Sequence, residues 1–368
     1  MRQPLKRSWV EISLKQIQIN YKICKNSLPK KTSIMAVVKA DAYGHGDIEV
    51  AKALQDIGVD LWAVSNIEEA CRLRNHGIQG DILILGYTPI ENLECVAKNG
   101  ITQAILSTEY AEAVLKTKIK IKCQFAIDTG MNRIGLNAEE PEKCIKLIRD
   151  FDSVCHIDGI FTHLCVADST DEKHQEFTKE QIDKFETIAD GLIDLNINHI
   201  HCMNSAGGLW HNTKYNAIAR LGIILYGLKP DSSNILPTGI KPALQWKSVV
   251  SMVKSVNVGE TIGYGCTFKA YKPMVVATVP TGYADGYNRM LSNKGHVIIN
   301  GENAPIVGRV CMDQFMIDVT YISNVEMGTE VLLLSTQYNA DNMANDTGTI
   351  GYEIICNISK RVPRIYND

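Results

Sequence analysis

The stretch MAVVKADAYGHG, residues 35–46, places a lysine where an apolar, partly β-branched run gives way to small, turn-forming residues. Such a run is typical of a short buried strand, so we expect Lys39 at the mouth of a strand. Burial disfavours an ammonium group and lowers its pKa, which frees the amine for Schiff-base chemistry. A lysine whose amine reaches solvent is the plain alternative.

Two other stretches carry groups that could bind a cofactor or an anion. Arg220 stands inside the apolar run AIARLGIILYG, where a charge has to be either paired or functional. MNSAGG, residues 203–208, follows a predicted strand and opens a predicted helix, so Ser205 and free backbone N–H groups could hold an anion. A buried ion pair and an ordinary helix cap are the respective alternatives.

These residues need elements to position them, and from residue 33 to about 225 short apolar runs alternate with longer amphipathic ones. The predicted strands are SIMAVVK, LWAVSN, DILILGY, ITQAILS, IKCQFAID, HIDGIFTHL, HIHCMN and IARLGIILYG. Helix-like segments lie between them, among them 47–58, 66–77 and 171–195. Eight βα units in roughly 200 residues predict a (β/α)8 TIM-type barrel with its chemistry at the carboxyl ends of the strands. An open doubly wound sheet is the alternative.

A change of composition at residues 230–242, rich in Pro, Ser and Gly, predicts a domain boundary. We therefore assign residues 1–235 to the barrel and residues 236–368 to a second, mostly β domain. Short β-rich runs separated by turn residues follow from residue 248 onward. The polar segment 336–348 is predicted to be an exposed loop.

Length and charge exclude several kinds of partner. The chain has 368 residues, 45% of them hydrophobic, and a net charge of −3 with no long basic block, so neither nucleic acid nor an anionic membrane is an expected partner. Eleven cysteines without CxxC pairs are expected to be reduced thiols of a cytoplasmic protein, and no metal site is predicted. No apolar run approaches the roughly 18 residues of a membrane helix.

VVKADAYGHG resembles the cofactor-lysine motif of the alanine racemases, pyridoxal 5'-phosphate (PLP) enzymes of the barrel type, and TIGYGCTFKA resembles their tyrosine motif. The resemblance runs from Trp9 to the terminal RVPRIY. It implies that Lys39 binds PLP covalently and acts as one catalytic base, with Tyr264 as the second base on the opposite face of the substrate. A free phenol ionises only near pH 10, so this tyrosine would need cationic or hydrogen-bonding neighbours. Without the resemblance, Tyr264 is predicted to be a core residue of the β domain.

The resemblance also assigns binding residues. It implies that Arg220 hydrogen-bonds the pyridine nitrogen of PLP, while His163 is expected to order the ring or to act on the tyrosine. The implied phosphate contacts are Tyr43, Ser205, Gly222, Ile223 and Tyr352. The substrate carboxylate is expected at Arg133 and at the backbone N–H of Met312. One position departs from the family: Ala126 stands where many members have a carbamylated lysine that orients the arginine.

The implied activity is interconversion of L-alanine and D-alanine, which supplies D-alanine for peptidoglycan, by a homodimer with shared active sites. The segment THLCVADSTDEKHQEFTKEQI is similar to the racemase domain of serine racemases linked to vancomycin resistance, so a serine or dual specificity is the alternative. Tyr352 is expected to fill the space beside the substrate side chain, which favours alanine. A PLP carrier would lack the second domain and the tyrosine, and a decarboxylase would have a glutamate in place of Arg220.

Overall fold

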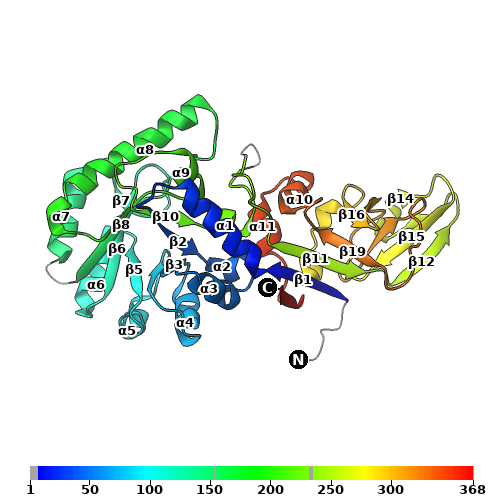
Figure 1. The fold of residues 1–368 in the computed structure, drawn as a ribbon, viewed down its shortest axis with the longest axis horizontal. Coiled ribbons are helices and arrows are strands. Elements are labelled where there is room, and N and C mark those ends of the chain that lie inside the picture. The colour runs from blue at the N-terminus through cyan, green and yellow to red at the C-terminus, as the bar shows by residue number, and fades with distance from the viewer. Residues whose placement is uncertain (1–6, 153–154, 232–234, 368) are drawn as a thin grey trace.

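The computed structural model describes residues 7–152, 155–231 and 235–367. A barrel formed by the first part of the chain and a β-rich domain formed by the last part lie beside each other along the long axis of the molecule (Figure 1). Of the predicted boundary at residues 230–242, residues 232–234 lie outside the described residues.

The barrel is a ring of parallel strands in the order β10-β2-β3-β4-β5-β6-β8-β9. A single bridge between Met203 and Ala219 joins β9 to β10 and brings the two ends of the ring together. The strands are β2 (Ser33–Val37), β3 (Leu61–Val64), β4 (Asp81–Ile84), β5 (Thr102–Ile105), β6 (Lys122–Asp128), β8 (His156–Phe161), β9 (His199–His201) and β10 (Ile218–Leu221). All eight predicted strands are therefore confirmed. Because helices cover them outside, most of their residues are buried, as their nearly continuous apolar sequences require.

Helices connect the strands and cover the outside of the barrel (Figure 1). They are α2 (Lys39–Tyr43), α3 (Asp47–Gln55), α4 (Ile67–Asn75), α5 (Leu93–Lys98), α6 (Thr108–Thr117), α7 (Pro141–Asp152), α8 (Glu172–Asp190) and α9 (Ser205–Trp210). Side-chain caps set several of their starts: Asn66 accepts from the N–H of Glu69, and Asp171 accepts from those of Lys173 and His174. Some connections are short, as between β3 and α4, whereas longer loops precede α5, α7 and α8.

The second domain consists of two antiparallel-rich sheets and a small hairpin. The larger sheet runs in the order β17 (Glu302–Pro305), β16 (His296–Ile299), β19 (Glu330–Leu334), β11 (Leu244–Val249), β1 (Ser8–Ser13) and β20 (Arg364–Asn367). The smaller contains β12 (Met252–Val256), β15 (Met274–Val279) and β18 (Phe315–Asp318). The hairpin pairs β13 (Thr261–Ile262) with β14 (Phe268–Lys269). Its turn, residues 263–266, packs against Arg309 and Met316 of the same domain.

The two ends of the described chain meet in the larger sheet. Strand β1 pairs antiparallel with β11 on one side and parallel with β20 on the other. Helix α1 (Leu14–Ser27) then carries the chain from this sheet to the barrel. Strand β1 falls within the range that the sequence assigns to the barrel, but its partners belong to the β-rich domain.

The prediction of an exposed loop at residues 336–348 is wrong, because the segment contains helix α10 (Ala340–Thr347). Asn339 and Asn342 form a capping box at its start, and Gly348 ends it with a φ of 72°. Ala340, Met343 and Ala344 are buried, so packing of one face stabilises a helix whose sequence is otherwise mostly polar. Helix α11 (Gly351–Cys356) follows and packs against α2 of the barrel.

None of the helices in the described part of the chain combines the length and the apolar character needed to cross a membrane.

Candidate active site

A cavity of about 430 Å³ opens at the carboxyl ends of the barrel strands. Nine of the eleven predicted site residues line it: Lys39, Tyr43, Arg133, His163, Ser205, Arg220, Gly222, Ile223 and Tyr352. Eight come from the barrel, and Tyr352 comes from helix α11 of the second domain. The other two, Tyr264 and Met312, lie elsewhere on the surface. The fold therefore collects the cationic and phosphate-binding candidates in one place and leaves the second predicted base outside it.

Lys39 begins helix α2, two residues after strand β2 ends. Its ammonium group has no hydrogen-bond or ion-pair partner among the described residues. Burial lowers the pKa of Lys39, and the positive charge of Arg133 lowers it further. A larger fraction of the side chain is therefore a neutral amine, the form that attacks a carbonyl.

The backbone after Lys39 forms a left-handed turn. Ala40, Asp41, Ala42 and Tyr43 have φ values between 51° and 57°, although each such residue costs roughly 1–2 kcal/mol outside glycine. The Glu69 carboxylate accepts hydrogen bonds from the N–H groups of Ala40 (2.8 Å) and Ser65 (2.7 Å). Further contacts hold the turn, so the strain is maintained by its surroundings and brings both Lys39 and Tyr43 to the cavity.

A group of polar atoms suited to an anion lies on one wall of the cavity. Ser205 Oγ accepts from the N–H of Gly222 at 3.1 Å, while the N–H of Ile223 has no partner within the described ranges. The hydroxyl groups of Tyr43 and Tyr352 likewise bind no other described residue, and their rings lie 5.9 Å apart. A Cβ added at Gly222 would lie 2.5 Å from Tyr43 Oη, so only glycine allows this approach. Two hydroxyl groups and a free amide are available to a phosphate here.

Arg220 is 4% exposed and forms no ion pair with a carboxylate of the described residues. Its Nη1 donates to His201 Nδ1 (2.5 Å) and to the His201 carbonyl (3.1 Å), and its Nη2 donates to the Thr162 carbonyl (2.6 Å). The Cys202 carbonyl lies 3.4 Å from Nη2. These contacts use the hydrogens on Nη1 and Nη2. The remaining donor, Nε–H, is therefore available to an acceptor in the cavity. The buried ion pair, the alternative that the sequence left open, is not formed.

Arg133 and His163 line the same cavity but differ in charge. The Arg133 guanidinium has no hydrogen-bond partner in the parts of the chain that the structure describes, and the short side chain of Ala126 lines the same cavity without offering one. Burial, followed by the charges of Arg220, Arg133 and Lys39, lowers the pKa of His163 to about 3. His163 is therefore neutral near pH 7, and Arg133 is free to bind a carboxylate.

Tyr264 and Met312 lie on turns of the β-rich domain and are 71% and 54% exposed. The prediction made without the resemblance, that Tyr264 is a core residue of the β domain, is therefore wrong. It starts the turn η4 (Tyr264–Cys266) between β13 and β14. The Cys311 N–H donates to the Gln314 carbonyl and closes the turn that contains Met312. The N–H of Met312 itself has no hydrogen-bond partner among the described residues. Both groups are free to act on a ligand held by another surface.

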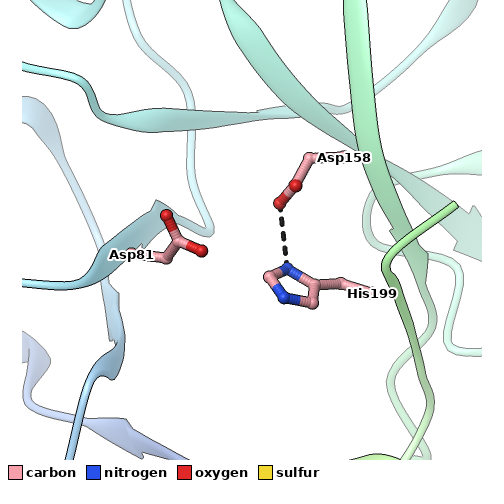
Figure 2. Close-up of side chains that lie close together, drawn as sticks. All are labelled: Asp81, Asp158 and His199. Atoms are coloured by element: carbon pink, nitrogen blue, oxygen red, sulfur yellow. Dashed lines mark ion pairs between the residues drawn. The ribbon is translucent and has the colours of Figure 1, made fainter.

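A polar cluster lies near the opposite, amino ends of the barrel strands. The possible metal-binding atoms of Asp81, Asp158 and His199 are within 4.8 Å of one another, and His199 Nδ1 is 2.9 Å from Asp158 (Figure 2). The Lys122 ammonium lies 2.8 Å from Asp81 and 3.3 Å from Asp158. A cation of the protein itself, Lys122, therefore already pairs with both carboxylates.

Comparison with known proteins identifies the fold and both domains. Residues 12–230 match the family described as alanine racemase, N-terminal domain, and residues 243–366 match alanine racemase, C-terminal domain. The chain belongs to the alanine racemase family. It is 42% identical over 372 aligned positions to alanine racemase 1 of Clostridium acetobutylicum, covering 97% of this chain and 95% of that protein.

Solved structures of alanine racemases have the same fold. That of Clostridium difficile 630 superposes with a TM-score of 0.92 at 36% identity, covering 99% of this chain and 97% of the other. The alanine racemase of Bartonella henselae, which has covalently bound pyridoxal phosphate, superposes with a TM-score of 0.87 at 30% identity, covering 98% of this chain and 99% of the other. The α/β barrel with a mostly β second domain is thus the fold of the alanine racemase family.

Residues that the sequence did not single out also shape the site of this alanine racemase family member. His201 and Gln124 are polar residues inside apolar strands, the same anomaly that drew attention to Arg220. That signal could have found both of them. Glu69 is an ordinary helix residue in the sequence, and only its two backbone contacts reveal that it supports the left-handed turn.

Proposed function

We propose that this protein is a PLP-dependent isomerase that interconverts L-alanine and D-alanine. The observation that carries the proposal is the unpaired Lys39 amine in the same cavity as the free Nε–H of Arg220 and the anion-binding wall, in a member of the alanine racemase family. When bound, PLP withdraws electrons from the substrate and makes its α-proton acidic. The remaining chemistry is the work of the residues described above.

The residues of the cavity fit PLP at both ends of the cofactor. Tyr43, Ser205, Gly222, Ile223 and Tyr352 would hold the phosphate, since they present hydroxyl groups and a free amide to the cavity. Arg220 would donate its Nε–H to the pyridine nitrogen. A guanidinium keeps its protons near neutral pH, so it would leave this nitrogen unprotonated. His163 lines the same cavity beside these residues and would contribute a neutral ring.

Lys39 supplies one of the two bases that racemisation requires, because one proton must leave one face of Cα and another must arrive at the opposite face. Burial and Arg133 lower the pKa of its amine, so the neutral form that accepts a proton is more abundant than for a free lysine. Arg133 and the N–H of Met312 would hold the substrate carboxylate. The unpaired Arg133 guanidinium supports this role.

Tyr264 supplies the second base, and we propose that it comes from the partner subunit of a homodimer. Its 71% exposed side chain belongs to the second domain and is not among the residues that line the barrel cavity of its own chain. In a two-fold dimer, each barrel mouth can face the β-rich domain of the other subunit. Each of the two sites would then combine Lys39 of one chain with Tyr264 of the other.

Alanine is the proposed substrate, because Tyr352 places a bulky phenol in the cavity and leaves little room for a larger side chain. Serine, as a minor or a dual substrate, is the alternative. D-alanine made by a cytoplasmic enzyme would supply peptidoglycan synthesis.

The test is isotope exchange. Purified protein in deuterated buffer should exchange the α-hydrogen of L-alanine and abolish its optical rotation, and both should be faster than with L-serine. Borohydride should fix the cofactor covalently to Lys39, as peptide mapping would show. Attachment to another lysine, or no exchange with either amino acid, would contradict the proposal.

A further inference from the structure

A hydrogen-bonded chain runs through the interior of the barrel from the cofactor side to the polar cluster at the opposite end. Arg220 Nη1 contacts His201 Nδ1 at 2.5 Å, and His201 Nε2 contacts Gln124 Oε1 at 2.9 Å. Gln124 Nε2 lies 3.3 Å from Asp158 Oδ2, the oxygen that His199 Nδ1 approaches to 2.9 Å. Figure 2 shows the Asp158 end of this chain. His201, Gln124 and Asp158 are each no more than 1% exposed.

The two ends of the chain fix the direction of every hydrogen bond in it. Arg220 has only donors, so His201 Nδ1 must be the acceptor and the imidazole proton must be on Nε2. Asp158 is acceptor-only when ionised, so the amide nitrogen of Gln124 must face it and the amide oxygen must face His201. Reversal of any one group would set two donors or two acceptors against each other inside the barrel, where an unsatisfied polar group is costly.

The charge states agree with this direction. Burial and the charge of Arg220 keep the pKa of His201 well below its usual range, so the ring is neutral. Burial alone would raise the pKa of Asp158, but the hydrogen bond from His199 and the charge of Lys122 lower it overall, so the carboxylate is ionised. The chain therefore joins a cation at the cofactor side to an anion at the opposite end through two neutral groups.

The surrounding strands are shaped for this chain. Gln124 is on β6 and His201 is on β9, so the glutamine side chain must cross β8, which lies between them. The residue of β8 in register with Gln124 is Gly159, where a Cβ would lie 2.9 Å from Gln124 Cδ. Phe161, also on β8, stacks on the His201 ring at 5.6 Å and lies 5.4 Å beneath the Arg220 guanidinium. Gly159 leaves room for the glutamine side chain, and Phe161 limits the motion of the His201 ring and of the Arg220 guanidinium.

We propose that Gln124 is a positioning residue for Arg220: it holds His201 as the Nε2–H tautomer, whose Nδ1 then fixes the guanidinium with its Nε–H toward the cofactor. The predicted effect on PLP binding rests on the proposed function, whereas the predicted tautomer of His201 does not. Without Gln124, His201 can take the Nδ1–H form, which turns its proton toward Arg220 and displaces the guanidinium.

The test compares Gln124→Met, which keeps the volume and removes the acceptor, with Gln103→Met as a matched control. Gln103 is a fully buried glutamine on the adjacent strand β5, and among the described residues its amide nitrogen donates to the Gly86 and Ala104 carbonyls alone. The first readout is the ¹⁵N spectrum of histidine-labelled holoenzyme, with His201 assigned from a His201→Gln sample. The second is the dissociation constant of PLP, followed by absorbance together with the spectrum of the bound cofactor.

We expect His201 of the wild type to be neutral and protonated on Nε2. Gln124→Met should add the Nδ1–H tautomer of His201 and shift the cofactor spectrum. It should also weaken PLP binding about tenfold, the order expected for losing a hydrogen bond that supports a charged group. Gln103→Met should change none of these. Gln124→Glu, which restores an acceptor, should return His201 to the wild-type tautomer.

A wild-type His201 protonated on Nδ1 would overturn the proposal without any variant. Equal losses of PLP affinity in the two methionine variants would also overturn it, because packing alone would then explain the effect. If the wild type binds no PLP at all, the proposed function fails, and the ¹⁵N result still decides the tautomer.

Discussion

The barrel mouth and the Tyr264 hairpin are built in opposite ways. At the mouth, cationic and hydroxyl groups line one cavity, and a strained backbone turn held by Glu69 brings Lys39 to it. The hairpin presents Tyr264 on an exposed turn of the second domain, outside that cavity. The first region is organised by its own chain. In the proposed mechanism, the second offers a reactive group whose surroundings come from another molecule, so catalysis and assembly are inseparable there.

The largest effect on racemisation is expected when one of the two bases is removed from each chain and the two variant chains are then combined. Lys39→Ala and Tyr264→Phe homodimers should each be nearly inactive, because every site lacks one base. After subunit exchange about half of the dimers are mixed, and each of these has one intact site, so the mixture should regain about a quarter of the wild-type activity. Racemisation measured before and after exchange gives the result.

The control for this experiment is a mixture in which exchange is verified separately, for example with two differently tagged chains. If the verified mixture remains as inactive as its parents, the two bases belong to one chain and the comparison of the two regions fails.

At the barrel mouth, the effect of the Arg133 charge on the pKa of the Lys39 amine can be tested separately. Because this charge lowers the pKa of the Lys39 amine, Arg133→Gln should raise that pKa toward the ordinary value. The rate at which cofactor-free protein condenses with PLP should then reach its maximum at higher pH. Arg149→Gln, on the outer helix α7, should leave the profile unchanged. An unshifted profile in Arg133→Gln would mean that burial alone tunes the amine.

A smaller effect is expected at Tyr352, the residue through which the second domain contributes to its own barrel. Tyr352→Asn removes bulk from the cavity and should raise kcat/KM for serine relative to alanine several-fold, because the larger substrate gains most from the space. The ratio of the two constants is the measurement. No change in the ratio would place Tyr352 away from the substrate side chain.

No effect at all is expected from carbon dioxide. Ala126 cannot be carbamylated, and no described residue holds the Arg133 guanidinium in place of a carbamylated lysine. Racemisation in degassed buffer should therefore match that in bicarbonate buffer. A reversible loss of activity on degassing would show that a lysine elsewhere in the chain performs this task.

The strands of the barrel could be predicted from sequence because a strand buried on both faces must be apolar along its length, as in SIMAVVK and DILILGY. Helix α10 could not, since its stability comes from a capping box and three buried small or flexible side chains. The left-handed turn was also beyond prediction. Residues 40–43 contain no glycine, and only their distant partners impose positive φ values on them.

The motifs predict where the cavity lies, but they do not predict that Tyr264 and Met312 lie outside it. Tyr264 and Met312 are near Lys39 in neither sequence nor space, and periodicity carries no information on which chain a residue serves. Gln124 and His201 stand out in the sequence only as polar residues within apolar strands, and their role becomes clear once their partners on other strands are known.

Strand β1 lies between β11 and β20, the first strand after the barrel and the last of the chain. A ribosome therefore releases β1 more than two hundred residues before its first partner exists, while the barrel strands that emerge next can pair with one another at once. All barrel strands from β2 to β10 are therefore made before β1 can enter the larger sheet. Chains cut short anywhere before β11 would expose an unpaired strand at their amino end, where a chaperone or another nascent chain could bind it.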